Sequence, residues 1–85
     1  HIGAVRRKLK SGYVYGAYDY DRQKPTYIFE YFPAIGLMRD EFSSKVIVMP
    51  ENEAEFEHGR KKLLSLVSFR RRIFSENNTL YIFRP

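Results

Sequence analysis

Two largely apolar segments separated by a short polar stretch predict a hairpin near the start of the chain. Residues 13–20 and 26–32 are rich in aromatic and β-branched residues, which favour strands. The polar stretch between them, residues 21–25, ends in proline and is typical of a turn. Both faces of the second strand are largely apolar. We therefore expect a sheet that is covered on both sides or presents an aromatic face to a partner.

Four tyrosines in the first of these strands have mixed parity. Tyr13 and Tyr15 would lie on one face of a regular strand, and Tyr18 and Tyr20 on the other. One extra residue near Gly16 would bring all four to the same side, and glycine is a common residue at β-bulges. We therefore expect a bulge at this position.

The second half of the chain predicts two further strands and a turn. Residues 45–49 lack alternation, which indicates a short, fully buried central strand that ends at Pro50. Residues 75–78 are typical of a turn, and its two asparagines are suited to positive φ. The last strand is expected at residues 79–83.

A helix is predicted between these two strands. Asn52 is a good N-cap, and Glu55 three residues later completes a pattern like a capping box. Phe56, Leu63 and Val67 have helical spacing and would form the stripe that faces the sheet.

Gly59 lies inside this helix, where a glycine costs up to about 1 kcal/mol relative to alanine. It is therefore expected to allow close packing of the helix backbone on the sheet. Glu57 and Lys61 are spaced for an i,i+4 ion pair. The elements together predict an α+β fold. It would have a small mixed or antiparallel sheet of about four strands, in the order strand-strand-strand-helix-strand, and one helix packed on one face by a right-handed crossover.

Length and composition indicate one domain. Eighty-five residues cannot divide their apolar side chains between two cores, so we expect residues 13–85 to form a single domain behind a basic N-terminal arm at 1–12. The chain has no cysteine, which excludes disulfides, thiolate metal sites and cysteine nucleophiles. Small secreted domains usually contain disulfides, so we expect an intracellular or organellar interior (cytoplasm, mitochondrial matrix or plastid stroma) and not secretion.

No arrangement of residues predicts catalysis. His1 and His58 are far apart in sequence, and His58 is expected at the surface of the helix. Asp19 and Asp21 beside basic residues make a poor cation site, and no glycine-rich phosphate loop is present. We therefore expect a protein that is not an enzyme, with no cofactor, no metal and no small-molecule substrate.

The net charge of +5 is concentrated toward the two ends of the chain. Clustered charge of this kind steers partners. The basic positions expected to bind a partner are Arg6, Arg7, Lys8, Lys10, Arg60, Lys61, Arg70, Arg71 and Arg72.

Two functions fit these clusters together with the aromatic residues. The first is a non-catalytic accessory subunit that docks on a larger protein complex with an acidic surface, since aromatic residues and arginine are enriched at protein interfaces. The second is binding of single-stranded RNA or DNA, in which aromatic residues stack on bases and basic residues contact phosphates. For either, the expected aromatic positions are Tyr13, Tyr15, Tyr18, Tyr20, Tyr27, Phe29 and Tyr31.

The order of several short features resembles one known family. A basic segment before Tyr13-Val14, then Ile28-Phe29-Glu30, a proline, Met38-Arg39, a basic helix and a closing stretch at residues 81–85 are similar to the ferredoxin-docking stromal subunit of photosystem I. The family's threonine-glycine-glycine stretch after the proline and its C-terminal extension are absent. The resemblance implies a cofactor-free α+β protein lying on a membrane complex, where it docks an acidic electron carrier. No segment of this chain is long and apolar enough to span a membrane.

Overall fold

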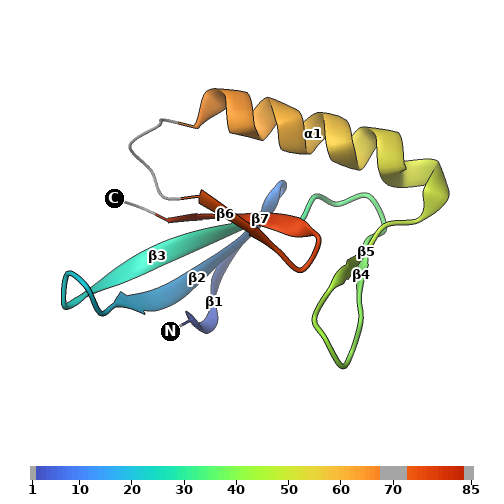
Figure 1. Ribbon diagram of the computed structural model, residues 1–85. Coiled ribbons are helices and arrows are strands. Elements are labelled where there is room, and N and C mark those ends of the chain that lie inside the picture. Colours follow the sequence, from blue (N-terminus) through green and yellow to red (C-terminus); the bar gives the residue numbers. More distant parts are fainter. Residues whose placement is uncertain (1, 68–72, 84–85) are drawn as a thin grey trace.

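The computed structural model describes residues 2–67 and 73–83, with side chains from residue 7 onward. Its main feature is a five-stranded antiparallel sheet in the order β1-β2-β3-β7-β6 (Figure 1). The strands are β1 Ile2–Leu9, β2 Gly12–Asp19, β3 Lys24–Tyr31, β6 Ile73–Glu76 and β7 Thr79–Phe83. The α+β class with one α-helix packed on a sheet is confirmed, although the described sheet has five strands instead of about four.

The hairpin of β2 and β3 has a regular register from Gly12 opposite Tyr31 to Asp19 opposite Lys24. The bulge expected near Gly16 is therefore wrong, and the strand keeps its normal alternation. The register shifts lie in β1 instead, on either side of its pairing with Tyr15. The turn is held by the side chain of Asp19, whose Oδ1 accepts the backbone N–H groups of Asp21 and Arg22 at 3.1 and 3.2 Å.

The basic segment expected as an arm at 1–12 instead contributes the edge strand β1, which pairs with β2 through a turn of two residues. The pattern of hydrophobic residues did not predict this strand, because an edge strand tolerates charged residues on both faces. Gly12, the first residue after the turn, permits β2 to approach β3 closely. A Cβ atom at this position would lie 1.9 Å from the carbonyl oxygen of Glu30.

The predicted third strand is wrong in extent and place. Only Val46–Ile47 forms a strand, β5, and it pairs with β4 (Met38–Arg39) in a separate two-stranded sheet (Figure 1). Val46 is buried while Ile47 is exposed. Val46 is fixed from outside this sheet, because its N–H donates to Asn77 C=O at 2.8 Å and its C=O accepts from the Asn78 side chain at 3.1 Å. The predicted strand lies outside the main sheet, so the crossover expected from it through the helix to the last strand is also wrong. The helix lies instead on the connection from β3 to β6, two strands that β7 separates in the sheet.

The helix α1 spans Glu53–Leu66 and follows a 3-10 turn, η1, at Pro50–Asn52. Asn52 occupies the N-cap, as predicted, but makes no capping hydrogen bond. Its side-chain amide donates to the carbonyl of Ile35 at 2.8 Å, so it ties the helix start to the loop after β3. The ion pair on the helix surface joins Glu57 to Arg60 at i,i+3, not to Lys61.

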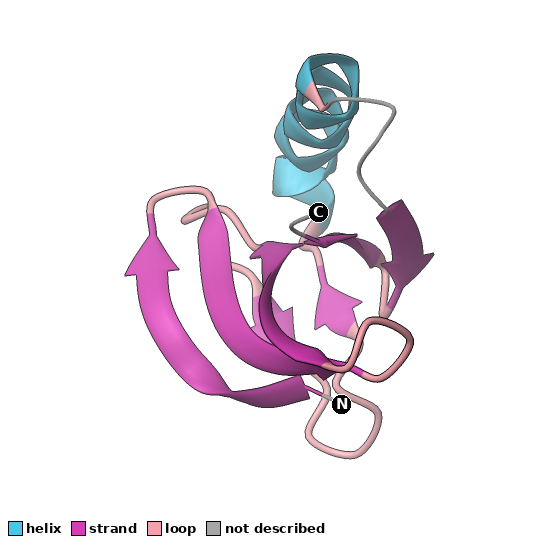
Figure 2. Ribbon diagram, turned by 90° about the vertical axis from the view of Figure 1, so that its left-hand side faces the viewer, coloured by secondary structure: helices cyan, strands magenta, loops and turns pink. Residues whose placement is uncertain are grey.

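The core lies between α1 and one face of the curled sheet (Figure 2). Phe56 and Tyr31 are both buried there, and their rings stack with centroids 5.1 Å apart. The Tyr31 hydroxyl also donates to the backbone carbonyl of Phe56 at 2.9 Å. The close approach predicted at Gly59 is confirmed, because a Cβ atom there would lie 2.2 Å from the Tyr31 hydroxyl oxygen.

The turn between β6 and β7 is tighter than expected. Asn77 and Asn78 have φ values of 54° and 61°, which confirms their predicted positive φ. Ser75 and Glu76, expected in the turn, belong to β6. Two asparagines suffice for the turn because their side chains tolerate the left-handed region.

Candidate docking groove

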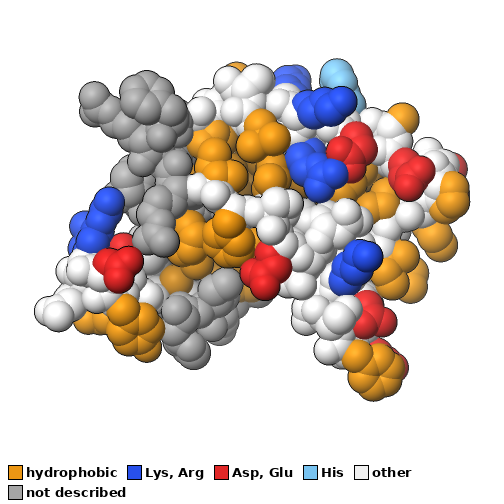
Figure 3. Space-filling model, viewed as in Figure 1, with side chains coloured by type: hydrophobic (Ala, Val, Ile, Leu, Met, Phe, Trp, Pro, Cys, Tyr) orange, Lys and Arg blue, Asp and Glu red, His pale blue; other side chains and the backbone are white. Residues whose placement is uncertain are grey.

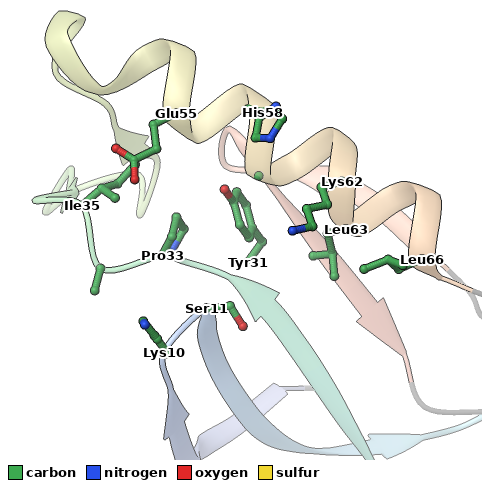
Figure 4. A pocket seen from close by; sticks show the side chains of 12 residues that line it. Lys10, Ser11, Tyr31, Pro33, Ile35, Glu55, His58, Lys62, Leu63 and Leu66 are labelled. Atoms are coloured by element: carbon green, nitrogen blue, oxygen red, sulfur yellow. The ribbon is translucent and has the colours of Figure 1, made fainter.

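A groove of about 570 Å³ lies between the β1–β2 end of the sheet and the helix α1. Its walls are the turn between β1 and β2, the stretch after β3, and one side of α1 (Figure 4). This volume lies within the range of sites that accept a side chain or a small ligand. We call this space the docking groove.

The docking groove has an apolar lining that continues from the core and is exposed at Leu66. Tyr31 and Pro33 belong to the end of β3 and the loop after it, and Leu63 and Leu66 lie on α1. Leu66 is 74% exposed, although it is a leucine on the last turn of the helix. Exposed apolar side chains beside a concave surface are typical of interaction sites.

Charged side chains surround this lining. Lys10 on the β1–β2 turn and Lys62 on α1 lie on opposite sides of the groove, with Tyr31 between them (Figure 4). His58 and Glu55 contribute the remaining ionisable groups from the helix. Lys10, Lys62, His58 and Glu55 are all exposed to solvent. Two lysines against one glutamate give the groove a positive character that favours an anionic ligand group.

The structure distributes the predicted basic residues over different surfaces. Arg7, Lys8 and Lys61 are exposed but do not line the docking groove. Arg60 is half-buried. Its Nε donates to Glu57 Oε2 at 3.2 Å, and its guanidinium carbon lies 5.4 Å from the centre of the Phe56 ring.

Lys10 is therefore the one predicted basic residue found in the groove among the residues described, and Lys62 had no place in that set. The side chain of Arg6 and the residues Arg70, Arg71 and Arg72 lie outside the described part of the chain.

The predicted aromatic residues are likewise divided between the two sheet faces. Tyr31 and Phe29 face the helix and contribute to or pack against the core. Tyr13 and Tyr15 lie on the opposite face, where the Tyr13 ring packs 5.4 Å from that of Phe32.

Three of the predicted tyrosines remain exposed beyond the core. Tyr18, Tyr20 and Tyr27 are 39%, 68% and 46% exposed. Tyr18 and Tyr27 share a face near the β2–β3 turn, because Tyr27 is paired with Gly16, two residues from Tyr18. No single platform of seven aromatic residues forms.

A buried carboxylate on the face opposite the helix was not predicted. Glu30 has no exposed surface, and Arg39 reaches it from β4 with two guanidinium nitrogens. The hydroxyls of Tyr15 and Tyr81 donate to the same carboxylate at 2.7 and 2.8 Å. The Arg39 guanidinium carbon also lies 4.6 Å from the centre of the Phe32 ring. These contacts join the β4–β5 hairpin to the main sheet.

The hydrogen bonds in this network keep Glu30 ionised. Burial alone would raise its pKa, but donation from Arg39, Tyr15 and Tyr81 outweighs burial and holds the pKa below the usual range. Hydrogen bonding to Glu30 raises the pKa of Arg39, and burial raises the pKa of both tyrosines. Every buried side-chain nitrogen and oxygen described has a partner. The network is thus complete as it stands and serves to hold the hairpin.

Residues with metal-binding side chains are scattered in the described ranges 2–67 and 73–83, where no three of His, Cys, Asp or Glu gather into a potential metal site. Within the same ranges, no helix has the length and apolar character needed to cross a membrane.

Comparison with known proteins gives a match of fold. No protein-family model matches the chain, and no curated protein matches it. A solved structure described as PpkA-294 in its apo form is similar over 96% of this chain, with a TM-score of 0.78 and 23% sequence identity. The chain spans about a third of that protein, since 33% of its length is covered. The similarity shows that the fold recurs as part of a larger protein. The resemblance to the photosystem I subunit receives no support from a family match.

Proposed function

We propose that this domain is a non-catalytic binding module that docks an acidic, partly apolar segment of a partner protein in the docking groove. The observation that carries the proposal is the pairing of an apolar lining, exposed at Leu66, with lysines on both sides of it. The apolar lining would bury a hydrophobic anchor of the partner, and the lysines would orient neighbouring carboxylates.

The described residues do not reproduce one known catalytic arrangement, that of protein kinases. Protein kinases hold ATP with a glycine-rich loop, a lysine on the third strand and a glutamate on a helix. Here the first two strands are joined by only Lys10 and Ser11, and the lysine of β3, Lys24, is exposed at the strand start. Phe29 packs toward the helix in the middle of β3. No ion pair among the described residues joins β3 to α1.

The proposal is tested by fluorescence anisotropy with two labelled pentapeptides, Asp-Glu-Phe-Leu-Asp and its basic counterpart Lys-Arg-Phe-Leu-Lys. The acidic peptide is expected to bind more tightly. Lys62→Glu is expected to weaken its binding by about 5-fold or more, because reversal replaces an attraction by a repulsion. The matched control is Lys61→Glu, which changes the same net charge on the next residue outside the groove. Equal effects of the two variants would refute binding in this groove.

The exposed tyrosines favour a second candidate, the binding of single-stranded nucleic acid near the β2–β3 turn. The ring centroids of Tyr18 and Tyr20 lie 5.0 Å apart, and two exposed basic residues are close in sequence, Arg22 in the turn and Lys24 at the start of β3. Stacking on such rings contributes about 1–3 kcal/mol per base. We expect Tyr20→Ala to weaken binding of a labelled oligo-uridine if this candidate is correct. Unchanged or absent binding would exclude it.

A further inference from the structure

Besides the docking groove, the domain has a second exposed apolar feature at the tip of the β4–β5 hairpin, residues 40–45. Phe42 at this tip is 90% exposed. The hairpin projects from the main sheet, and its end presents a hydrophobic side chain with acidic groups beside it (Figures 1 and 3). The acidic groups are Asp40 and Glu41, and Lys45 lies at the end of the same turn. The tip therefore combines an aromatic anchor with carboxylates.

The turn that carries Phe42 is closed by hydrogen bonds on both sides. The Asp40 carboxylate accepts from the N–H and the hydroxyl of Ser43 at 2.8 and 2.7 Å. The Asp40 N–H donates to Lys45 C=O at 2.8 Å, and the Ser44 N–H donates to Asp40 C=O at 2.9 Å. These bonds fix the backbone around Phe42. A partner therefore gains the contact of the ring at a low cost in conformational entropy.

The base of the hairpin is also fixed, so the tip has a defined position relative to the sheet. Arg39 on β4 pairs with the buried Glu30. Val46 on β5 is buried and bonded through both backbone groups to Asn77 and Asn78. Both strands of the hairpin are therefore anchored to the main body of the domain.

We propose that the hairpin tip of one copy of this chain occupies the docking groove of a second copy. This inference rests on the proposed function, because it names the acidic, apolar segment that the groove binds. Phe42 would enter beside Leu66 and Tyr31, and Asp40 and Glu41 would approach Lys10 and Lys62. The two surfaces lie on different elements of each copy, so the contact joins unlike patches. It either continues from copy to copy or closes into a pair in which the tip of each copy occupies the groove of the other.

The charges and shapes on the two surfaces support this pairing. The tip has two carboxylates and one lysine, whereas the groove has two lysines and one glutamate. An aromatic side chain buries about 150–250 Å² when it enters a pocket, which is enough to act as the anchor of a small interface. The groove exposes Leu66 for such a contact, and the partly buried Leu63 lies beside it in the lining.

The test is sedimentation velocity of the whole chain from low micromolar to near-millimolar concentration at low salt. The wild-type protein is expected to associate as its concentration rises. Phe42→Ser removes the anchor, and the double variant Lys10→Glu/Lys62→Glu removes the complementary groove charges, so each alone is expected to remain monomeric. All three residues are exposed, which preserves the fold, and circular dichroism verifies this. Tyr20→Ser changes another exposed aromatic side chain on a different surface, and this control should associate normally.

Mixing the two monomeric variants decides the proposal. Phe42→Ser retains an intact groove and the double lysine variant retains an intact tip, so the mixture is expected to form a one-to-one complex. A wild-type protein that stays monomeric throughout, or variants that associate as well as the wild type, would overturn the inference. The acidic peptide separates this result from the proposed function. Peptide binding by a monomeric protein would leave the groove's function standing, and absence of peptide binding would remove both.

Discussion

Single residues in this domain hold distant elements together, and Glu30 is the clearest case. Its carboxylate accepts hydrogen bonds from three side chains on β2, β4 and β7 while it is fully buried. Removal of its charge leaves Arg39, whose side chain is partly buried, without its counter-ion. Breaking a buried pair in this way costs about 3 kcal/mol.

The first prediction concerns the pH dependence that Glu30 confers. Its pKa in the folded protein lies below that of the unfolded chain, so the network stabilises the fold at neutral pH. This stabilisation is lost as the pH falls from the unfolded pKa, about 4.3, through the folded pKa. We expect Glu30→Gln to lower the free energy of unfolding at pH 7 and to flatten its decline at acidic pH. Urea denaturation at pH 7 and at acidic pH measures the free energy of unfolding, with the exposed Glu41→Gln variant as control.

A second prediction concerns the contact of Gly59 with Tyr31. A Cβ at residue 59 would overlap the tyrosine hydroxyl, and the buried ring has little room to move. Gly59→Ala is therefore expected to destabilise the fold by about 1–3 kcal/mol, despite the better helix propensity of alanine.

Removal of the hydroxyl should relieve this clash. In a Tyr31→Phe background the nearest ring atom would lie 3.2 Å from the new Cβ, so Gly59→Ala should cost little or become stabilising. Thermal denaturation of the four proteins in a double-mutant cycle gives the coupling. Additive effects would show that Tyr31 does not determine the need for glycine.

At the scale of elements, the junction of β1, β2 and β3 depends on Gly12. A Cβ there would meet the backbone oxygen of Glu30, and backbone cannot yield as a side chain does. We expect Gly12→Ala to separate the strands at this end and to lower the free energy of unfolding by about 2 kcal/mol or more. Amide hydrogen exchange should accelerate in β1 and at the end of β3. Ser11→Ala, an exposed neighbour, should leave exchange unchanged.

The elements with strong local signals could be predicted from the sequence. The strands rich in aromatic and β-branched residues around the turn, the helix after Asn52 and the two asparagines with positive φ all depend on residues close in the chain. The edge strand β1 escaped because charge conceals alternation at an edge. The stretch around Val46 escaped because its partners, Asn77 and Asn78, lie more than thirty residues away.

The residues of the candidate site were also predicted only in part from the sequence. Lys10 was predicted from its basic cluster, whereas Lys62 became relevant only when the helix placed it across from the β1–β2 turn. A glutamate in an otherwise apolar strand was the available signal for Glu30. The identity of its partner required the fold, because Arg39 lies on a strand of the other sheet.

On the scale of the whole molecule, the domain leaves many large apolar side chains exposed for its size. The hairpin exposes Met38, Phe42, Ile47 and Met49, and the helix exposes Leu64 and Leu66. A chain of this length buries only about two thirds of the surface of its unfolded state, so its stability is small and sensitive to binding. A partner that covers these residues would contribute directly to the stability of the fold.

This sensitivity yields a last prediction. If the hairpin tip of one copy binds the groove of another, association involves only the folded state, so the melting temperature must rise with protein concentration. The rise should shrink at high salt, because ions screen the contacts of Asp40 and Glu41 with the lysines. Phe42→Ser should melt at one temperature whatever its concentration. Differential scanning fluorimetry over a hundredfold range of concentration measures both proteins, and a melting temperature of the wild type that does not change would contradict self-association.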